Sequence, residues 1–203
     1  MAELPQILIR YKDQVLDART IIAIVNEASQ VPYTPVPIEQ IAPLEFRGFV
    51  FSAERYADCL EELKPLHAAH WQETEKYRHE LPLDPDYAGF IRMEAMGKLV
   101  LLTIRKDGEL VGQTTMKLYN SMHSQTLVAN EDSLFLRADQ RGSLPAMLAF
   151  IRFVRDALAS VGVREVRVSS KLVNGADKLM IRGGFKPFAT QLVMMIGGDK
   201  HEA

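Results

Sequence analysis

An apolar run, a polar turn that ends in glycine and an amphipathic helix follow one another within residues 132–153, and this order constrains the fold most. Large apolar residues in segment 133–137 predict a buried strand. Ser143 can cap the helix that follows, and Pro145 fits its first turn because that amide hydrogen has no intrahelical partner. Apolar residues then recur at helical spacing up to Gly162, namely Leu144, Met147, Leu148, Ile151, Val154, Leu158 and Val161.

The strand, turn and helix form a candidate anion site. Their succession aims free backbone amides and the positive end of a helix at one point, which suits a phosphate. Gly142 is the single glycine of the turn, and an ordinary strand–helix connection explains the same pattern. Both interpretations stay open on these grounds alone.

The stretch resembles motif A of the GNAT superfamily of acyl-CoA-dependent N-acetyltransferases. In that motif a strand with a Leu-Tyr-Val-like core leads into Arg-x-x-Gly-x-Gly/Ala at the start of a long helix. The strand core falls on residues 134–136 here, and residues 141–146 overlay the loop. The resemblance implies that acetyl-CoA is bound by Leu134, Phe135, Leu136, Arg141, Gly142, Ser143, Leu144 and Ala146.

Two residues depart from motif A. Leu144 stands where a glycine is expected, and Pro145 removes one amide donor. The leucine side chain either crowds a bound pyrophosphate, or it points away from the pyrophosphate and only the leucine amide contacts it.

A second resemblance lies near the C-terminus. GNAT proteins commonly carry Asn-x-x-Ala-x-x-Leu-Tyr-x-Lys-x-Gly-Phe, and the residues in register are Ala176, Leu179, Arg182, Gly184 and Phe185. Asn174 is one place off and is carried over as a cofactor-binding residue. Met180 replaces the tyrosine that often serves as general acid. A CoA thiolate leaves without such a donor because a free thiol has a pKa of about 8.5.

The segment 67–73 supplies candidate bases. His70 and Glu73 are three residues apart and share one face of a predicted helix. They can act as a base or an amine ligand, or they form a solvated polar face beside a buried Trp71. No metal is expected, because no further histidine or cysteine lies at zinc-ligand spacing. The order His-aromatic-x-Glu resembles a segment of GNAT-like proteins of tailed bacteriophages.

In the phage proteins a histidine also precedes the motif A strand, and His123 has that position here. Glu131 and Asp132 are alternative bases, of which only one should face the substrate because neighbours on a strand point oppositely. We expect His70 and Glu73 to face the acetyl position, together with His123 and the region of Asp132.

The element order predicts an α/β (α+β) domain at residues 44–203, with a GNAT-like mixed central sheet and helices on both faces. Residues 1–43 are expected to form an N-terminal extension with a proline-rich linker at 31–43. Strands are predicted at 6–11, 46–51, 98–105, 109–118, 126–137, 164–170 and 188–196, with the motif A strand central. Ser52 is expected to cap a helix that Pro65 interrupts. Segment 20–25 is a helix or a strand.

Composition excludes several classes of protein. A net charge of −2 without clusters of Lys and Arg gives no nucleic-acid footprint. Cys59 is the one cysteine, cannot form an internal disulfide and is expected to fill the core. No apolar run spans a bilayer, and the first residues do not read as a signal peptide. These features predict a soluble protein of a reducing compartment. The resemblance to phage proteins implies the cytoplasm of a bacterium or of a phage-infected host, or a place in the virion.

Two functions follow from the resemblance. The first is transfer of an acetyl group from acetyl-CoA to a primary amine of unknown identity. The alternative is a catalytically inactive GNAT-like virion or interaction protein, which the changes at Leu144, Pro145 and Met180 favour. In either case residues 1–43 are a candidate surface for a homo-oligomer or for virion assembly.

Overall fold

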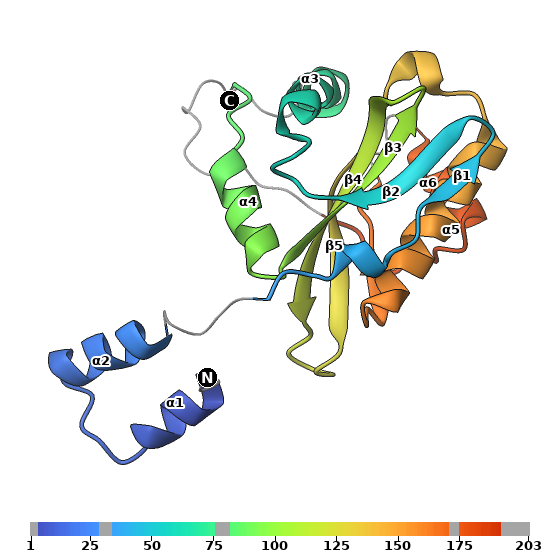
Figure 1. The fold of residues 1–203 in the computed structure, drawn as a ribbon. Helices are drawn as coiled ribbons and strands as arrows, with labels where there is room; N and C mark the ends of the chain where they lie inside the picture. The colour runs from blue at the N-terminus through green and yellow to red at the C-terminus, as the bar shows by residue number, and fades with distance from the viewer. Residues whose placement is uncertain (1–3, 29–33, 76–81, 171–174, 192–203) are drawn as a thin grey trace, which may run out of the picture.

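The computed structural model describes residues 4–28, 34–75, 82–170 and 175–191 (Figure 1). Six strands form one sheet in the order β1-β2-β3-β4-β5-β6. The strands are β1 (Leu44–Phe46), β2 (Phe49–Glu54), β3 (Leu99–Lys106), β4 (Glu109–Asn120), β5 (Leu127–Leu136) and β6 (Glu165–Arg167). Neighbours are antiparallel except for β5 and β6, which are parallel. The predicted mixed sheet is therefore confirmed.

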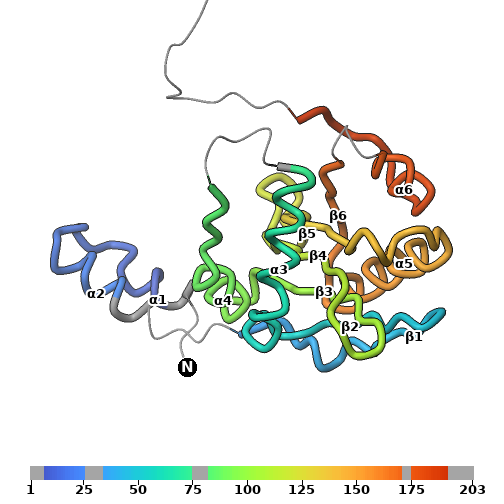
Figure 2. Tube along the Cα trace, turned by 90° about the horizontal axis from the view of Figure 1, so that it is seen from above, coloured from blue at the N-terminus to red at the C-terminus, as the bar shows by residue number. Residues whose placement is uncertain are grey.

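Helices cover both faces of the sheet, as the sequence predicts. The α-helices are α1 (Leu4–Arg10), α2 (Ala18–Ala28), α3 (Leu60–His70), α4 (Tyr87–Ala95), α5 (Leu144–Ser160) and α6 (Ala176–Arg182). Short turns are η1 (Ile38–Gln40), the π-helical η2 (Trp71–Glu75) and η3 (Ala138–Gln140). Helices α3 and α4 lie on one face and α5 and α6 on the other (Figures 1 and 2). Helices α1 and α2 pair with each other to one side of the sheet.

Strand β3 shows why the sheet is covered twice. Val100, Leu102 and Ile104 pack into the cluster under α5, which also takes in apolar residues of segment 36–41. Leu99 and Leu101 point the other way, into the cluster under α3 and α4. Both sets are buried because successive side chains of a strand point to opposite faces. A continuous apolar run such as this one is typical of a strand covered on both faces.

The motif A stretch folds as predicted. Strand β5 leads through η3 to α5, and Ser143 Oγ accepts a hydrogen bond from the Ala146 amide at 3.4 Å. A tight turn joins β3 and β4, with φ values of 51° at Asp107 and 84° at Gly108. Strand β5 is the fifth of the six strands, so it is interior but does not lie in the middle of the sheet.

Other predicted elements are wrong. The predicted strand 6–11 is the helix α1, because a short alternating run does not discriminate between the two. Segment 20–25 is helical within α2, and Asp17 Oδ1 accepts a hydrogen bond from the Thr20 amide at 2.8 Å. Strand β6 is shorter than predicted. Residues 188–191 form no strand, and residues 192–196 of that prediction lie outside the described part.

The predicted helix start at Ser52 is also wrong. Strand β2 continues to Glu54, because Ser52 Oγ bonds to Thr103 Oγ1 of β3 at 2.9 Å instead of capping a helix. Helix α3 begins at Leu60 and runs unbroken through Pro65. Proline in a helix interior costs about 3 kcal/mol. Burial of Leu63 and Leu66 on the same helix offsets this cost.

Candidate functional site

Strands β5 and β6 are paired over a short distance only. Three residue pairs join them, Val128 with Glu165, Ala129 with Val166 and Asn130 with Arg167. Strand β5 then continues for six residues to Leu136, and no described residue pairs with it on that side. The backbone groups of this stretch of β5 are therefore presented at an open edge next to β6.

A β-bulge lies where the pairing of β5 and β6 ends. Thr115 of β4 is opposite Ser133 and Met116 is opposite Glu131, so Asp132 has no partner in the ladder. The carboxylate of Asp132 forms an ion pair with Lys117. Bulges redirect side chains and are common next to active sites.

Two amides of β5 point at the open edge. The Arg137 amide donates to Val111 O of β4 at 2.9 Å. Because backbone groups alternate along an antiparallel strand, the backbone groups of Phe135 also point toward β4, whereas those of Leu134 and Leu136 point away from it. Leu136 O accepts a hydrogen bond from Arg141 Nε at 2.8 Å. The amides of Leu134 and Leu136 are thus the donors directed at the edge.

The loop before α5 presents further amides. Gly142 has φ 110°, and no atom lies within 4 Å of the position that a Cβ would take. Within the described ranges, the amides of Gly142, Ser143 and Leu144 have no acceptor. The Leu144 side chain is 41% exposed. The first turn of α5 can therefore bind an anion, although Pro145 has no amide hydrogen and the Ala146 amide is used by Ser143.

Two residues predicted for different tasks contact each other. Glu73 accepts two hydrogen bonds from Arg141, both at 2.7 Å. These bonds lower the pKa of Glu73, which therefore stays a carboxylate and is a weak base at neutral pH. The Arg141 guanidinium also lies 5.3 Å from the ring of Phe135, and the His70 ring packs on the same phenyl group at 5.4 Å. Phe135 is thus the common contact of His70 and Arg141.

His123 lies elsewhere. It is an exposed residue of the turn between β4 and β5, and the Ser121 hydroxyl accepts a hydrogen bond from its amide at 3.3 Å. From Leu127 to Phe135 the strand rises by about 26 Å, at roughly 3.3 Å per residue. Since His70 packs on Phe135, the structure does not place His70 and His123 in one site. The expected arrangement of the two histidines is corrected accordingly.

The remaining predicted residues are placed as follows. Glu131 Oε2 accepts a hydrogen bond from the Ser169 amide at 3.1 Å, which ties β5 to the segment after β6. Leu134 and Leu136 direct their side chains into the cluster under α5, so only their backbone reaches the open edge. Asn174 lies outside the described residues.

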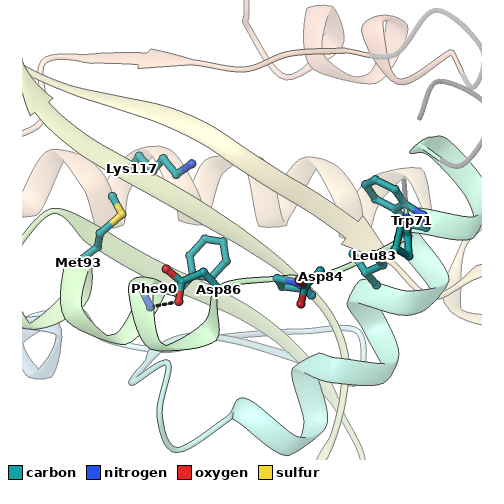
Figure 3. Close-up of a pocket in the computed structure, with 10 residues that line it drawn as sticks. Trp71, Leu83, Asp84, Asp86, Phe90, Met93 and Lys117 are labelled. Atoms are coloured by element: carbon teal, nitrogen blue, oxygen red, sulfur yellow. Dashed lines mark hydrogen bonds between the residues drawn. The ribbon is translucent and has the colours of Figure 1, made fainter. Parts of the chain in front are cut away.

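Sequence reasoning missed a pocket of about 650 Å³ (Figure 3). It lies between the end of α3, the start of α4 and strand β4, and its lining residues are Trp71, Pro82, Leu83, Asp84, Pro85, Asp86, Gly89, Phe90, Met93 and Lys117. Lys117 of this lining is the partner of Asp132 at the bulge. No motif marks the segment 82–86, and only its proline and aspartate content distinguishes it in the sequence.

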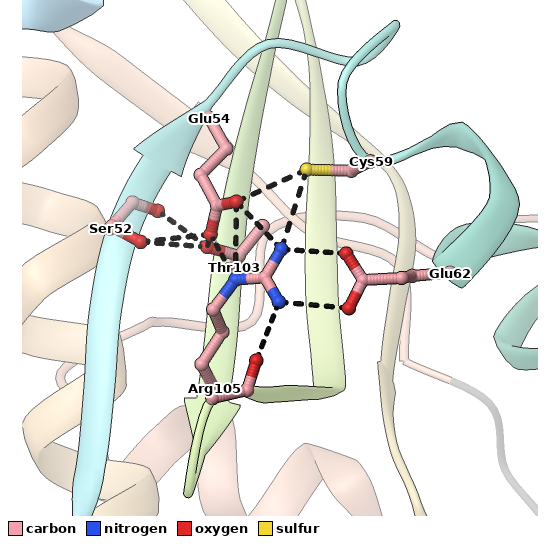
Figure 4. Close-up of polar contacts among 7 residues, drawn as sticks. Ser52, Glu54, Cys59, Glu62, Thr103 and Arg105 are labelled. Carbon is pink, nitrogen blue, oxygen red and sulfur yellow. Dashed lines mark hydrogen bonds and ion pairs between the residues drawn. The ribbon is translucent and has the colours of Figure 1, made fainter.

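A dense polar cluster lies at the start of α3 (Figure 4). The guanidinium of Arg105 donates to Glu54 at 2.9 Å and to Glu62 at 2.8 Å, and so joins β2, β3 and α3. Burial raises the pKa of Glu54, but hydrogen bonds from Arg105, Thr103 and Cys59 outweigh burial and lower it to about 2. Burial and the hydrogen bond to Glu54 raise the pKa of the Cys59 thiol to about 12. Cys59 is therefore a buried, unreactive residue of a structural cluster.

Two absences concern the described residues alone. No three His, Cys, Asp or Glu side chains among them gather in a group that could hold a metal ion. No helix in the same ranges has the length and apolar character needed to cross a membrane.

Comparisons with known proteins identify the fold. No family model matches the sequence, and no curated protein sequence matches it. Solved structures do match, among them a ribosomal-protein-alanine N-acetyltransferase from Brucella melitensis biovar Abortus 2308, with 19% identity, 73% of this chain and 99% of that chain covered, and a TM-score of 0.57.

Two further matching structures contain a bound ligand. An aminoglycoside acetyltransferase from an uncultured soil metagenomic sample, in complex with sisomicin, has 14% identity, coverage of 75% and 97%, and a TM-score of 0.56. AAC(6')-Iy in complex with the bisubstrate analogue CoA-S-monomethyl-acetylneamine has 15% identity, coverage of 73% and 97%, and a TM-score of 0.56. The chain therefore has the GNAT fold that its sequence predicts. The likeness to the phage-encoded subset stays a prediction.

The Arg105 cluster makes stability depend on pH. The pKa of Glu54 in the folded protein is about 2, below its ordinary value of 4.5. The stability that the Glu54 carboxylate adds is therefore fully present above pH 4.5 and is lost as the pH falls toward 2. Glu54→Gln should lower the free energy of unfolding at pH 7 by about 2 kcal/mol. It should also make the free energy of unfolding fall less steeply as the pH drops from 4.5 toward 2. Urea titrations at several pH values measure both effects.

Glu45→Gln, at an exposed position of β1, is the control for this experiment. It should leave both the stability and its pH dependence unchanged. An acid transition as steep in Glu54→Gln as in the unchanged protein would contradict the assignment.

Proposed function

We propose that the protein transfers the acetyl group of acetyl-CoA to a primary amine. The observation that carries the proposal is the unpaired edge of β5 beyond Asn130, which leads directly to the open first turn of α5. The extended chain of acetyl-CoA that carries the thioester can lie along such an edge, and its pyrophosphate can bind at the N-terminus of α5. The GNAT fold of the chain, shared with solved N-acetyltransferases, supports the same activity.

The loop residues fit the phosphates of CoA. Three amides, those of Gly142, Ser143 and Leu144, are available for a bound anion, and the space beside Gly142 is open. The exposed side chain of Leu144 does not have to occupy that space, so the departure from motif A is compatible with binding. Arg141 adds a positive charge, which in the free protein is paired with Glu73.

Three groups of the protein take part in the transfer, namely the Leu134 amide, the Asp132 carboxylate and Lys117. The neutral amine attacks the thioester carbonyl carbon, the C–S bond breaks, and the CoA thiolate leaves. The Leu134 amide donates to the carbonyl oxygen as negative charge develops there. The carboxylate of Asp132, directly or through one water, takes the proton that the amine nitrogen loses, and Lys117 holds this carboxylate in place.

Asp132 is favoured over the other candidate bases by its position at the bulge, two residues before the Leu134 amide. Glu131 is engaged by the Ser169 amide, and Glu73 is bound to Arg141 of the loop before α5. His70, which packs on Phe135, is the second candidate, because a histidine titrates near neutral pH. His123 is assigned no part in the reaction.

The direct test combines binding and turnover. Calorimetry should detect binding of acetyl-CoA, and thiol release should be observed when primary amines are added. If acetyl-CoA at millimolar concentration produces neither heat nor a shift in melting temperature, the proposal fails. The chain would then be a GNAT-like protein without cofactor binding, as the alternative from the sequence has it.

Gly142→Asp should abolish binding of acetyl-CoA. The substitution places a carboxylate against the phosphates and forces a residue with a side chain to adopt φ 110°. Calorimetry should show a loss of affinity of at least about 100-fold, which is roughly 2.7 kcal/mol.

Gly108→Asp is a matched control, because Gly108 also has a positive φ and open space around it but lies in the β3–β4 turn. It introduces the same strain and charge and should bind acetyl-CoA normally. Equal losses of binding in the two variants would show that the effect is not local to the loop.

Asp132→Asn should lower kcat by about 10²-fold and leave the affinity for acetyl-CoA nearly unchanged, because general-base catalysis is typically of this size. Glu131→Gln is the control, since its amide oxygen can still accept the bond from Ser169. Steady-state kinetics of both variants, with His70→Ala beside them, assigns the base. A large loss of kcat in His70→Ala alone would transfer the role to that residue.

Glu73→Gln should strengthen the binding of acetyl-CoA, by about twofold to fivefold. The substitution removes a carboxylate that competes with the pyrophosphate for Arg141, and exposed charged pairs contribute up to about 1 kcal/mol. Calorimetry measures the change in Kd. If kcat instead falls by 10² or more with an unchanged Kd, Glu73 acts in the transfer step.

A further inference from the structure

We propose that the pocket between Trp71 at the end of α3, the start of α4 and β4 binds the acceptor, and that the acceptor is an amine, cationic in water, attached to an aromatic or long alkyl body. The bound ammonium group loses one proton to solvent before the neutral amine attacks. The inference rests on the proposed acetyl transfer and specifies its substrate class. The walls of the pocket, its charge and its link through Lys117 to the β5 bulge support it.

The walls of the pocket are mainly apolar. Trp71 stands at one end, and Leu83, Phe90 and Met93 contribute further apolar surface (Figure 3). Phe90 is held in place by stacking on the buried Tyr56, with ring centroids 5.1 Å apart and an interplanar angle of 15°. Pockets of this size, lined by aromatic and aliphatic groups, favour ligands that have an apolar body.

The charged groups of the lining favour a cation. Asp84 and Asp86 supply two carboxylates, and Asp86 is fixed by the Gly89 amide at 2.8 Å. Lys117, the one lysine among the lining residues that the structure describes, is neutralised by its ion pair with Asp132. Arg92 contacts Asp86 at 3.3 Å from outside the lining, which leaves Asp84 as the main attraction for an ammonium group. Acidic groups beside apolar walls raise the local concentration of a cationic substrate.

Lys117 connects the pocket to the reacting groups. It lines the pocket, lies 6.0 Å from the ring of Phe90, and pairs with the Asp132 carboxylate at the bulge. An amine that enters the pocket therefore comes close to the ion pair that holds Asp132, the proposed proton acceptor. Asp132 in turn lies two residues from Leu134, whose amide faces the open edge of β5.

The same lining is poorly suited to a sugar. Recognition of an aminoglycoside or another polyhydroxylated acceptor needs a hydrogen-bond partner for most hydroxyl groups, because an unpaired buried hydroxyl is costly. Among the described residues that line the pocket, the side chains of Trp71, Asp84, Asp86 and Lys117 offer polar groups. Selectivity should therefore favour apolar amines over sugars.

Trp71 allows a direct binding test, because it is the single tryptophan of the chain and lines the pocket. Titration with phenethylamine should change its fluorescence and saturate, whereas sisomicin at the same concentrations should have at least tenfold weaker effect. In turnover assays with acetyl-CoA, kcat/KM for phenethylamine should exceed that for sisomicin by tenfold or more. Stronger binding or faster turnover of sisomicin would overturn the inference.

Two variants locate the effect in the pocket. Leu83→Gln should weaken phenethylamine binding about fivefold through the loss of apolar contact. Asp84→Asn should weaken it by about threefold and more so at low salt. Asp107→Asn removes the same charge from the β3–β4 turn, where asparagine tolerates the positive φ, and should have no effect. Identical behaviour of Asp84→Asn and Asp107→Asn, together with normal binding by Leu83→Gln, would place the ligand elsewhere.

Failure of this inference can be distinguished from failure of the acetyl transfer. If acetyl-CoA binds and amines other than apolar ones are acetylated, the transfer stands and the substrate class is wrong. If acetyl-CoA does not bind but phenethylamine still saturates the fluorescence change and responds to Leu83→Gln, the pocket takes the proposed ligand and the transfer is wrong. Absence of any fluorescence change with phenethylamine overturns the inference whatever acetyl-CoA does.

Discussion

The early end of the pairing between β5 and β6 is the constraint on which the rest of the site depends. A strand buried in a sheet normally satisfies its backbone on both sides, and unpaired groups there are costly. Here β5 is paired with β4 from end to end except at the bulge residue Asp132, but among the described residues it pairs with β6 at three positions only. The groups beyond Asn130 need another partner, and a bound chain with its own amides and carbonyls can supply one. The bulge at Asp132 occurs at the same place, so the strand changes partner and side-chain direction together.

How far the sequence predicts this arrangement depends on how local the cause is. The strand, the Ser143 cap and the start of α5 follow from neighbouring residues, and all three are confirmed. The extension of β2 through Ser52 does not, because its cause is a bond to Thr103, 51 residues away. The pocket is equally non-local, since Trp71, Phe90 and Lys117 come from three elements. The bulge has no signal in the sequence, and its position decides where Asp132 points.

The contact between Glu73 and Arg141 shows the same limit. Each residue was predicted for a task of its own, one as a base and the other as a phosphate ligand, and spacing 68 residues apart gives no hint that they pair. Pairing alters both tasks, because the carboxylate loses basicity and the guanidinium gains a competitor for the anion. A side chain taken from a motif keeps its chemical type, but its protonation and availability are set by the partners that the fold provides.

The π-helical turn after α3 joins the two halves of the proposed site. Residues Trp71 and Glu73 lie within this single turn, where Trp71 lines the pocket and Glu73 bonds to the loop before α5. Single π turns at the end of an α-helix are frequent at functional sites, because they change which way successive side chains point. A ligand that draws Arg141 away from Glu73 therefore acts on the same turn that carries the pocket wall. If the two proposed sites are occupied as inferred, this shared turn couples them without any larger movement of the sheet, which the Arg105 cluster holds against α3.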